Sequence, residues 1–175
     1  MKRLLFFVLL LSSLSSCMTI GFQQPQPAGK KSLDAFPAKL WGEYDDQPQG
    51  SKPELIIREN SVFLDGGNEM GEGVVQLGDT LVLKKFQGFY IASYLLPEEG
   101  YWIIHPFKTG PGELYLYSLD LKKEEAATRL SPFTKIKQQG EDFILLDPTK
   151  KELKKMLKNK ELWEVETLYR LPGSN

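Results

Sequence analysis

The chain has 175 residues, and its 22 Lys and Arg against 23 Asp and Glu leave a formal charge of −1, which gives no support to a nucleic-acid-binding surface. A hydrophobic content of 41% argues against a disordered chain, and a single cysteine excludes an intramolecular disulfide and any zinc site built on several cysteines. We therefore expect one globular domain whose core is held by hydrophobic packing.

Residues 1–17 have the composition of a secretory leader. Lys2 and Arg3 precede an uncharged apolar stretch, Leu4 to Leu11, and a serine-rich segment follows it. This stretch is shorter than the roughly 20 residues that a membrane-spanning helix requires. The leader is therefore expected to direct export rather than to span a membrane.

The end of this leader, Leu14-Ser15-Ser16-Cys17, resembles the lipobox of bacterial lipoproteins. The resemblance implies transfer of a diacylglyceryl group to the Cys17 sulfur, cleavage between Ser16 and Cys17, and membrane anchoring through lipid, with palmitate or a similar acyl chain. Two or three acyl chains give a stable anchor where one does not. The alternative is an ordinary secretory peptide that leaves Cys17 as a free thiol.

The residue after Cys17 is Met18 and not Asp, which by the sorting rule of enterobacterial lipoproteins favours the outer membrane over the inner. From Cys17 to about Asp34 the chain is rich in Gln and Pro, a composition that predicts a flexible tether reaching about 20 to 25 Å. The sequence thus predicts a signal peptide over 1–16, a lipidated tether over 17–34, and one β-rich domain over 35–175.

Short apolar or β-branched runs separated by turn residues predict most of the domain to be strands. Gly78-Asp79 is typical of a two-residue hairpin between the runs on either side of it. Residues 88–120 contain three such runs, which predict a meander. The first of them, Phe89 to Leu96, is apolar on both faces, so we expect it to be covered on both sides or to line a barrel. The predicted strands in this part of the chain are 36–44, 54–59, 61–65, 73–77, 80–86, 89–96, 101–107 and 113–120.

The last third of the chain predicts two strands, one helix and a final strand. Residues 121–127 are consistent with either a helical turn or an exposed hairpin end, residues 129–138 with an edge or bent strand because of Pro132, and residues 142–146 with another strand. A helix then starts with either Asp147 and Pro148 as N-cap and N1 or a Thr149/Glu152 capping box. Residues 165–171 predict the closing strand.

About eight to ten short strands with one amphipathic helix before the last strand favour a mainly β fold, either an antiparallel meander barrel or a sandwich. This order is similar to that of lipocalin-like barrels, in which an early strand carries Gly-x-Trp and a late helix precedes the final strand. Here Gly42-Glu43-Tyr44 has Tyr at the Trp position, and Trp41 comes before the glycine. The resemblance implies a barrel.

Few residues suggest catalysis. His105 is the only histidine, and it lies in an apolar run, so we interpret it as structural, although a Ser-His-Asp triad needs only one histidine. No Gly-x-Ser-x-Gly or phosphate-binding glycine motif occurs. Five carboxylates near turns could form a glycosidase pair or a calcium site, although turns commonly carry such residues. They are Glu43, Asp45, Asp46, Asp65 and Asp79.

Two further groups of residues suggest binding. Six lysines against one glutamate between Lys150 and Lys160 could contact anionic headgroups or an acidic partner, but lysine is also usual on the solvated face of a helix. The aromatic residues of the meander could stack on a sugar or line a small apolar cavity, or they could simply pack in the core. These aromatic residues are Tyr90, Tyr94, Trp102, Tyr115 and Tyr117.

The sequence predicts a noncatalytic lipoprotein of the bacterial cell envelope that is held on the membrane through Cys17 and binds a small ligand or another envelope component. The alternative is a structural or accessory subunit of an envelope complex. No cofactor, metal or nucleic acid is expected as a partner. The residues that bind the ligand are not identified by the sequence.

Overall fold

The structure, a computed structural model, describes residues 18–49, 52–64, 73–119 and 121–173. Ser16, Cys17 and Asp65 lie outside these residues, so the predicted cleavage and lipid sites stay predictions. The described chain is mainly β, with twelve strands connected in one mixed sheet, two α-helices and two short 3₁₀ helices, η1 (Ala38–Leu40) and η2 (Lys160–Leu162). The predicted mainly β class is confirmed.

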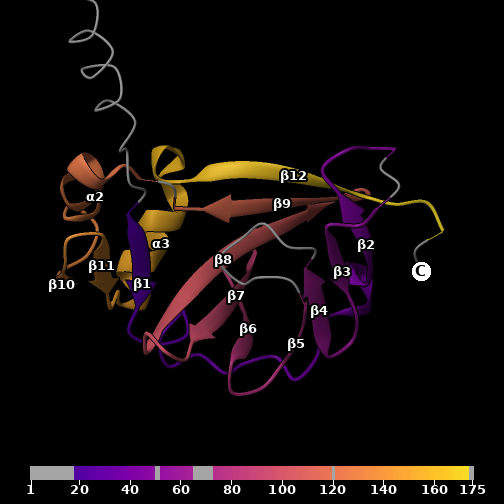
Figure 1. Ribbon diagram of the computed structural model, residues 1–175, viewed down its shortest axis with the longest axis horizontal. Helices are drawn as coiled ribbons and strands as arrows, with labels where there is room; N and C mark the ends of the chain where they lie inside the picture. The colour runs from indigo at the N-terminus through magenta and orange to yellow at the C-terminus, as the bar shows by residue number, and fades with distance from the viewer. Residues whose placement is uncertain (1–17, 50–51, 65–72, 120, 174–175) are drawn as a thin grey trace, which may run out of the picture.

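Nine strands form an antiparallel sheet that curls round on itself, in the spatial order β6-β7-β8-β9-β12-β2-β3-β4-β5 (Figure 1). Their bounds are β2 (Gly42–Asp45), β3 (Leu55–Ile57), β4 (Ser61–Leu64), β5 (Gly73–Gln76), β6 (Leu81–Phe86), β7 (Phe89–Leu96), β8 (Tyr101–Gly110), β9 (Glu113–Ser118) and β12 (Glu164–Arg170). The curled sheet fits an open barrel or a sandwich.

The sheet stays open between β5 and β6. In the described part of the chain β5 pairs with β4 alone and β6 with β7 alone, so the two-residue hairpin predicted at Gly78-Asp79 is wrong. The two-residue hairpin lies one loop later, at Gln87-Gly88 between β6 and β7, where both residues have positive φ values of 52° and 83°. Such φ values match the twist of paired strands, and the glycine adopts them without steric cost.

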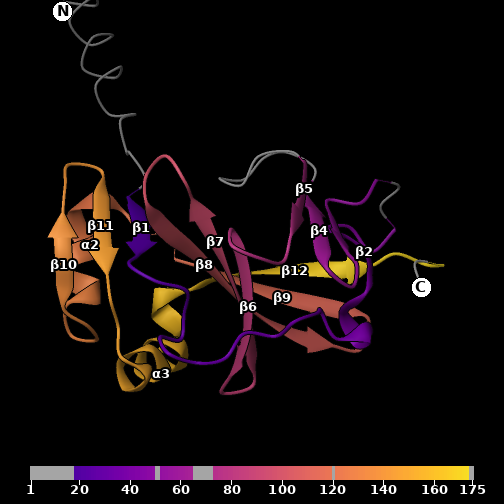
Figure 2. The same ribbon diagram turned by 90° about the horizontal axis from the view of Figure 1, so that it is seen from below.

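The chain before β2 covers the free edge of β6, as Figure 2 shows from below. The Leu33 N–H donates to the Leu83 carbonyl at 2.7 Å, and the buried Lys84 Nζ donates to the carbonyls of Pro25 at 2.8 Å and Pro27 at 3.1 Å. The structure therefore differs from the flexible tether predicted over 17–34. Backbone carbonyls that a Gln- and Pro-rich segment offers are satisfied here by β6 instead of by water.

The other end of the molecule is built on strand β1 (Thr19–Phe22), which the sequence did not predict. It pairs in parallel with β11 (Phe143–Leu146) and touches β8 at Trp102, while β10 (Ile136–Gln139) lies at the edge beside β11. Helices α2 (Lys123–Leu130) and α3 (Lys150–Lys158) complete this end (Figure 1). Helix α2 settles the ambiguity over 121–127, and β10 confirms an edge strand but begins later than predicted.

Helix α3 forms as its sequence predicts, through the capping box and not through Asp147 and Pro148. The Thr149 hydroxyl accepts a hydrogen bond from the Glu152 N–H at 3.3 Å, and the Glu152 carboxylate accepts one from the Thr149 N–H at 2.8 Å. The apolar stripe of Leu153, Met156 and Leu157 is buried. The helix thus closes the core just before β12, in the predicted order.

Strand β7 separates two hydrophobic clusters. Phe89 and Ile91 point into the cluster at the helical end, whereas Tyr90 and Ala92 point toward the interior of the curled sheet. The prediction that this strand is covered on both faces is therefore confirmed.

Candidate functional site

A cavity of about 510 Å³ lies inside the curled sheet. Cross-strand pairing places Ala92, His105 and Tyr94 on the same inner face, together with the alternate residues Leu114, Leu116 and Ser118 of β9. The volume falls within the range of about 300 to 1,000 Å³ that is typical of small-molecule sites. The inner face of the sheet is therefore only partly filled by its own side chains.

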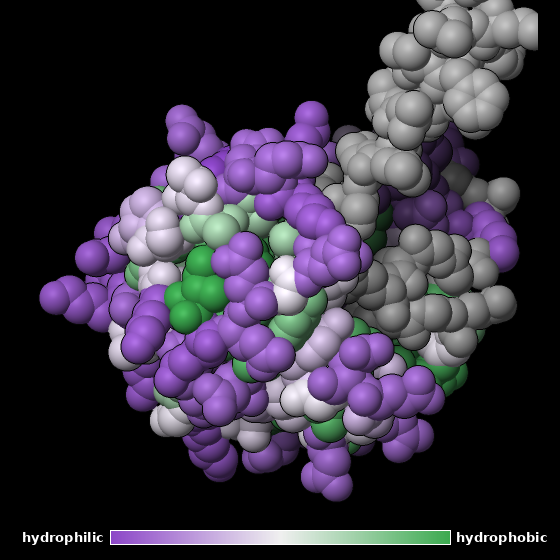
Figure 3. Space-filling view, turned by 60° about the vertical axis from the view of Figure 1, so that its left-hand side comes forward, coloured by the Kyte–Doolittle hydropathy of each residue, from purple (hydrophilic) through white to green (hydrophobic). Residues whose placement is uncertain are grey.

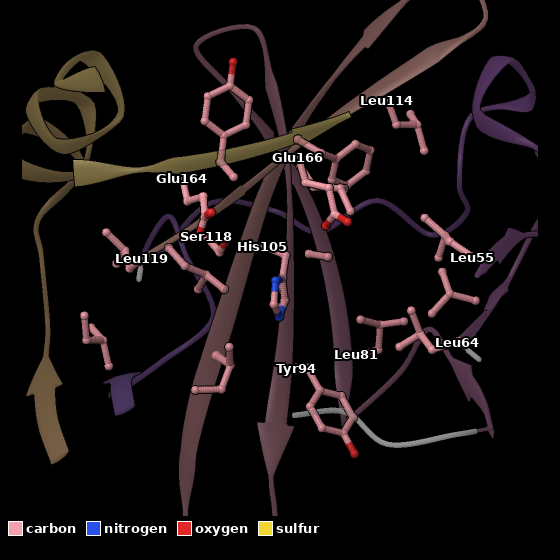
Figure 4. A pocket seen from close by; sticks show the side chains of 18 of the residues that line it. Leu55, Leu64, Leu81, Tyr94, His105, Leu114, Ser118, Leu119, Glu164 and Glu166 are labelled. Carbon is pink, nitrogen blue, oxygen red and sulfur yellow. The ribbon is translucent and has the colours of Figure 1, made fainter. Parts of the chain in front are cut away.

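One end of the cavity is apolar. Leu55 and Leu64 come from the paired strands β3 and β4, and Leu81 reaches the same region from β6 (Figure 4). Phe36, in the segment before β2, completes this wall. A ligand in this part of the cavity meets hydrocarbon, so the binding free energy there comes from burial of apolar surface.

The other end of the cavity lies where β8 separates from its neighbours. Strand β9 pairs with β8 from Phe107 to Gly110, and β1 meets β8 at Trp102, so the sheet splits along that edge around His105. Residues from both sides of the split, including Met18, Ile104 and Leu119, join the cavity lining. The cavity thus extends from the inside of the curled sheet toward β1.

Polar side chains gather at this split (Figure 4). Ser118 on β9 lies directly opposite Glu164 on β12, and Glu166 follows two residues later, on the same face as Glu164. Both glutamates are exposed to solvent although they line the cavity. The cavity therefore reaches the surface beside Glu164 and Glu166, and this is its polar mouth.

His105 lies between the apolar end and the polar mouth. Protein encloses the imidazole, part of which borders the cavity, and this burial lowers its pKa from 6.5 to about 4. Its Nε2 is buried without a hydrogen-bond partner among the described residues. Neutral imidazole carries one donor and one acceptor nitrogen, so His105 offers unused hydrogen-bonding capacity next to an otherwise apolar space.

The polar side chains at the mouth come from neighbouring strands. Glu164 and Glu166 project side by side from one face of one strand. No hydrogen bond joins Ser118 to His105 within the described chain, so the nucleophile and base contact of a serine hydrolase is not formed. The interpretation of His105 as structural stays a prediction.

The carboxylates singled out from the sequence lie away from the cavity. Glu43 forms an ion pair with Arg58 at 3.0 Å, and Asp45 accepts a hydrogen bond from the Gln47 N–H at 2.8 Å. Asp46 and Asp79 are exposed in turns, and Asp65 lies outside the described residues. Within the described ranges, no three His, Cys, Asp or Glu side chains come close enough to hold a metal ion.

Two of the five predicted aromatic residues, Tyr94 and Tyr117, line the cavity. Tyr90 stacks on Phe107 at 5.5 Å between ring centroids, and Trp102 packs against the core at the helical end. Tyr115 donates a hydrogen bond to the Glu113 carboxylate, which raises the pKa of the phenol. Most of these aromatic residues therefore pack against other side chains, and two of them, Tyr94 and Tyr117, are available to a ligand.

The surface offers little for a large apolar interface. Among the described residues, the exposed large hydrophobic side chains are Val74 and Val165. Figure 3, in which α2, β10 and β11 come forward, shows mainly hydrophilic side chains with small separate hydrophobic patches. The lysines of α3 are exposed around its buried stripe, and their contact with headgroups or an acidic partner stays a prediction.

No protein-family model, no curated protein and no solved structure matches this chain. No helix within the described residues is long and apolar enough to cross a bilayer.

Ser118, Glu164 and Glu166 were not among the residues that the sequence suggested as a site. The alternation Glu164-Val165-Glu166 at the start of a strand was the available signal, because it places two carboxylates on one face. Which face that is depends on the register of β12 against β9, and this pairing joins residues 46 positions apart at Glu164↔Ser118.

Proposed function

We propose that this protein is a lipoprotein of the bacterial cell envelope, anchored through lipid on Cys17 and placed on the outer membrane, whose β domain binds a small, largely apolar ligand without catalysis. The observation that carries the binding proposal is the cavity of about 510 Å³ with hydrocarbon at one end and His105 and two glutamates at the other. Mostly apolar cavities with a few placed polar groups are the usual form of small-molecule sites.

The alternative, a structural or accessory subunit of an envelope complex, has less support. A partner protein that binds stably usually buries a contiguous apolar patch. The described surface has two exposed large hydrophobic side chains, Val74 on β5 and Val165 on β12. The unfilled space is inside the domain, which favours a small ligand over a protein partner.

Packing next to the anchor supports a site close to the membrane. Met18, the residue after Cys17, lines the cavity, and its N–H donates to the Leu121 carbonyl at 3.4 Å. Strand β1 begins at Thr19, so the chain enters the fold almost at once. Lipid on Cys17 would hold the domain against the bilayer instead of at the end of a long tether, with the cavity near the lipid surface.

Ligand binding is tested with dodecanol as a probe. The full chain is reconstituted in lipid nanodiscs and analysed by native mass spectrometry, which counts probe molecules on the protein regardless of how much probe enters the lipid. We expect one bound dodecanol per chain, and we expect Ala92→Phe, which places a ring inside the cavity, to reduce the binding. Ala38→Phe on the exposed surface of η1 is the matched control. Equal binding by all three proteins would refute the cavity as the site.

The anchor is tested separately, by the mass of the protein purified from membranes. We expect a chain that begins at Cys17 and carries diacylglyceryl, and a Cys17→Ser variant without this added mass that no longer fractionates with membranes. An unmodified Cys17 thiol, or a variant that stays with membranes after cleavage of the leader, would contradict lipid anchoring.

A further inference from the structure

The two ends of the cavity differ in what they can bind, and this difference restricts the ligand. Leu55, Leu64 and Leu81 form a hydrocarbon wall, with Tyr94 across from Leu81 on the neighbouring strand, whereas the mouth carries Ser118, Glu164 and Glu166 (Figure 4). A molecule that fills the whole space must therefore have an apolar tail for the inner end and a polar head for the mouth.

The charge of the lining restricts the head group further. Among the described residues that line the cavity, none is Lys or Arg, and the acidic ones are Glu164 and Glu166. An anionic head at the mouth would gain no opposite charge and would lie near two carboxylates, a like-charge arrangement that is unfavourable. A head that donates hydrogen bonds meets carboxylate oxygens, a serine hydroxyl and an imidazole, all of which accept them.

We propose that the ligand is an amphiphile with a single apolar tail and a head group that donates hydrogen bonds and carries no negative charge, such as an alcohol or an amine, with the tail against Leu55, Leu64 and Leu81 and the head between His105 and the two glutamates. This inference depends on the proposed binding function and names its ligand class. His105 lies where head and tail meet. Its Nε2, which has no partner among the described residues, forms a hydrogen bond with the bound head group after a small adjustment of the surrounding side chains.

The experiment is a competition among three probes with the same tail. Dodecanol, dodecylamine and laurate are added in equal amounts to the full chain in nanodiscs at about pH 8, where a carboxylic acid is charged and an aliphatic amine is protonated. Native mass spectrometry then gives the relative occupancy of each probe on the protein. We expect the alcohol and the amine each to be bound at least about tenfold more than laurate, a factor that corresponds to a modest charge interaction near the surface.

The double variant Glu164→Gln and Glu166→Gln tests whether the mouth of the cavity is the end that discriminates among the three probes. Both side chains are exposed, so the variant is expected to keep the melting temperature of the parent protein. Removal of the two charges should reduce the discrimination against laurate to less than about threefold, mainly because laurate then binds more strongly. A double variant that still rejects laurate as strongly as the parent would overturn the placement of the head group.

The outcomes separate this inference from the proposed function. Binding of laurate as strongly as the other two probes overturns the ligand class and leaves the cavity as a binding site. Failure of all three probes to bind the unchanged protein overturns the proposed function, and this inference with it.

Discussion

The two ends of the molecule differ in how completely side chains fill them. At the helical end, Ala126, Leu130, Leu153 and Met156 are all 0% exposed in a core built from α2, α3, β1 and β11. At the curled-sheet end, the inward-facing apolar residues of β3 and β4 keep 2–8% of their surface exposed, around a cavity of about 510 Å³. The same chain thus contains a close-packed region and a hollow one. Because its apolar residues pack one end closely, a shortage of such residues does not explain the cavity at the other end.

The largest contrast is expected from removing a leucine side chain at each end. Leu153→Ala should lower the free energy of unfolding by about 3 to 4 kcal/mol, because the packed helical end cannot collapse into the space. Leu64→Ala, which enlarges an existing cavity, should cost about 1 to 2 kcal/mol. Urea unfolding of both variants measures the difference, and equal costs would mean that the curled-sheet end is as well packed as the other.

The second prediction concerns His105 and pH. Above about pH 6.5 the histidine is neutral in both the folded and the unfolded protein, so stability is highest there. As pH falls, the unfolded chain takes up a proton near pH 6.5 whereas the folded protein does so only at about 4, so stability decreases between these values, by up to about 3 kcal/mol.

This pH dependence can be assigned to one residue because His105 is the only histidine. Its ring protons, followed by NMR, should titrate near pH 4. The His105→Gln variant should lack the part of the decrease in stability between about pH 6.5 and 4 that the histidine causes in the parent protein. A ring that titrates near 6.5 would show that the side chain is open to water and that the curled-sheet end is not enclosed.

The third prediction reverses the first by adding volume. Ala126→Phe at the packed end should cost about 2 to 3 kcal/mol or prevent folding, because overpacking forces neighbouring side chains off their rotamers. Ala92→Phe, which points into the cavity, should cost less than about 1 kcal/mol because the ring finds unoccupied space. Thermal melts compare them, and a large loss for Ala92→Phe would mean that the cavity is already filled.

The smallest expected effect tests whether β1 belongs to the fold. A Cβ at Gly21 would lie 2.5 Å from Tyr101 Cδ2, beside the ring that stacks on Phe143, so Gly21→Ala should cost about 1 to 2 kcal/mol. Gly78→Ala, where a Cβ would meet no atom within 4 Å and the backbone φ is not positive, is a control for the change itself. If Gly21→Ala is neutral, β1 is the flexible tether that composition predicts.

Local signals predicted what depends on neighbouring residues. The capping box of Thr149 and Glu152 and the stripe of α3 need only residues within a few positions of each other, and the structure has both. The chain before β2 was missed because its pairing is distant in sequence: β1 joins β11 at Ile20↔Ile144, and Lys84 binds carbonyls 57 and 59 positions away. Amino-acid composition does not indicate partners that lie so far away in the sequence.

The candidate site was missed for the same reason. Sequence alone shows His105 in an apolar run and two glutamates at the start of a predicted strand, but their meeting depends on the register of β8, β9 and β12. The predicted hairpin at Gly78-Asp79 also had a sound local signal, and it fails because β6 pairs with β7 instead. Because β6 does not pair with β5, the curled sheet stays open along β5.

Xenon binding in a crystal of the protein would show whether the inside of the curled sheet is hollow, because xenon occupies empty apolar cavities. We expect xenon electron density against Leu55, Leu64 and Leu81 and none at the packed end beside Ala126 and Leu153. Absence of xenon between these leucines, with their side chains in contact, would contradict the cavity and the function proposed from it.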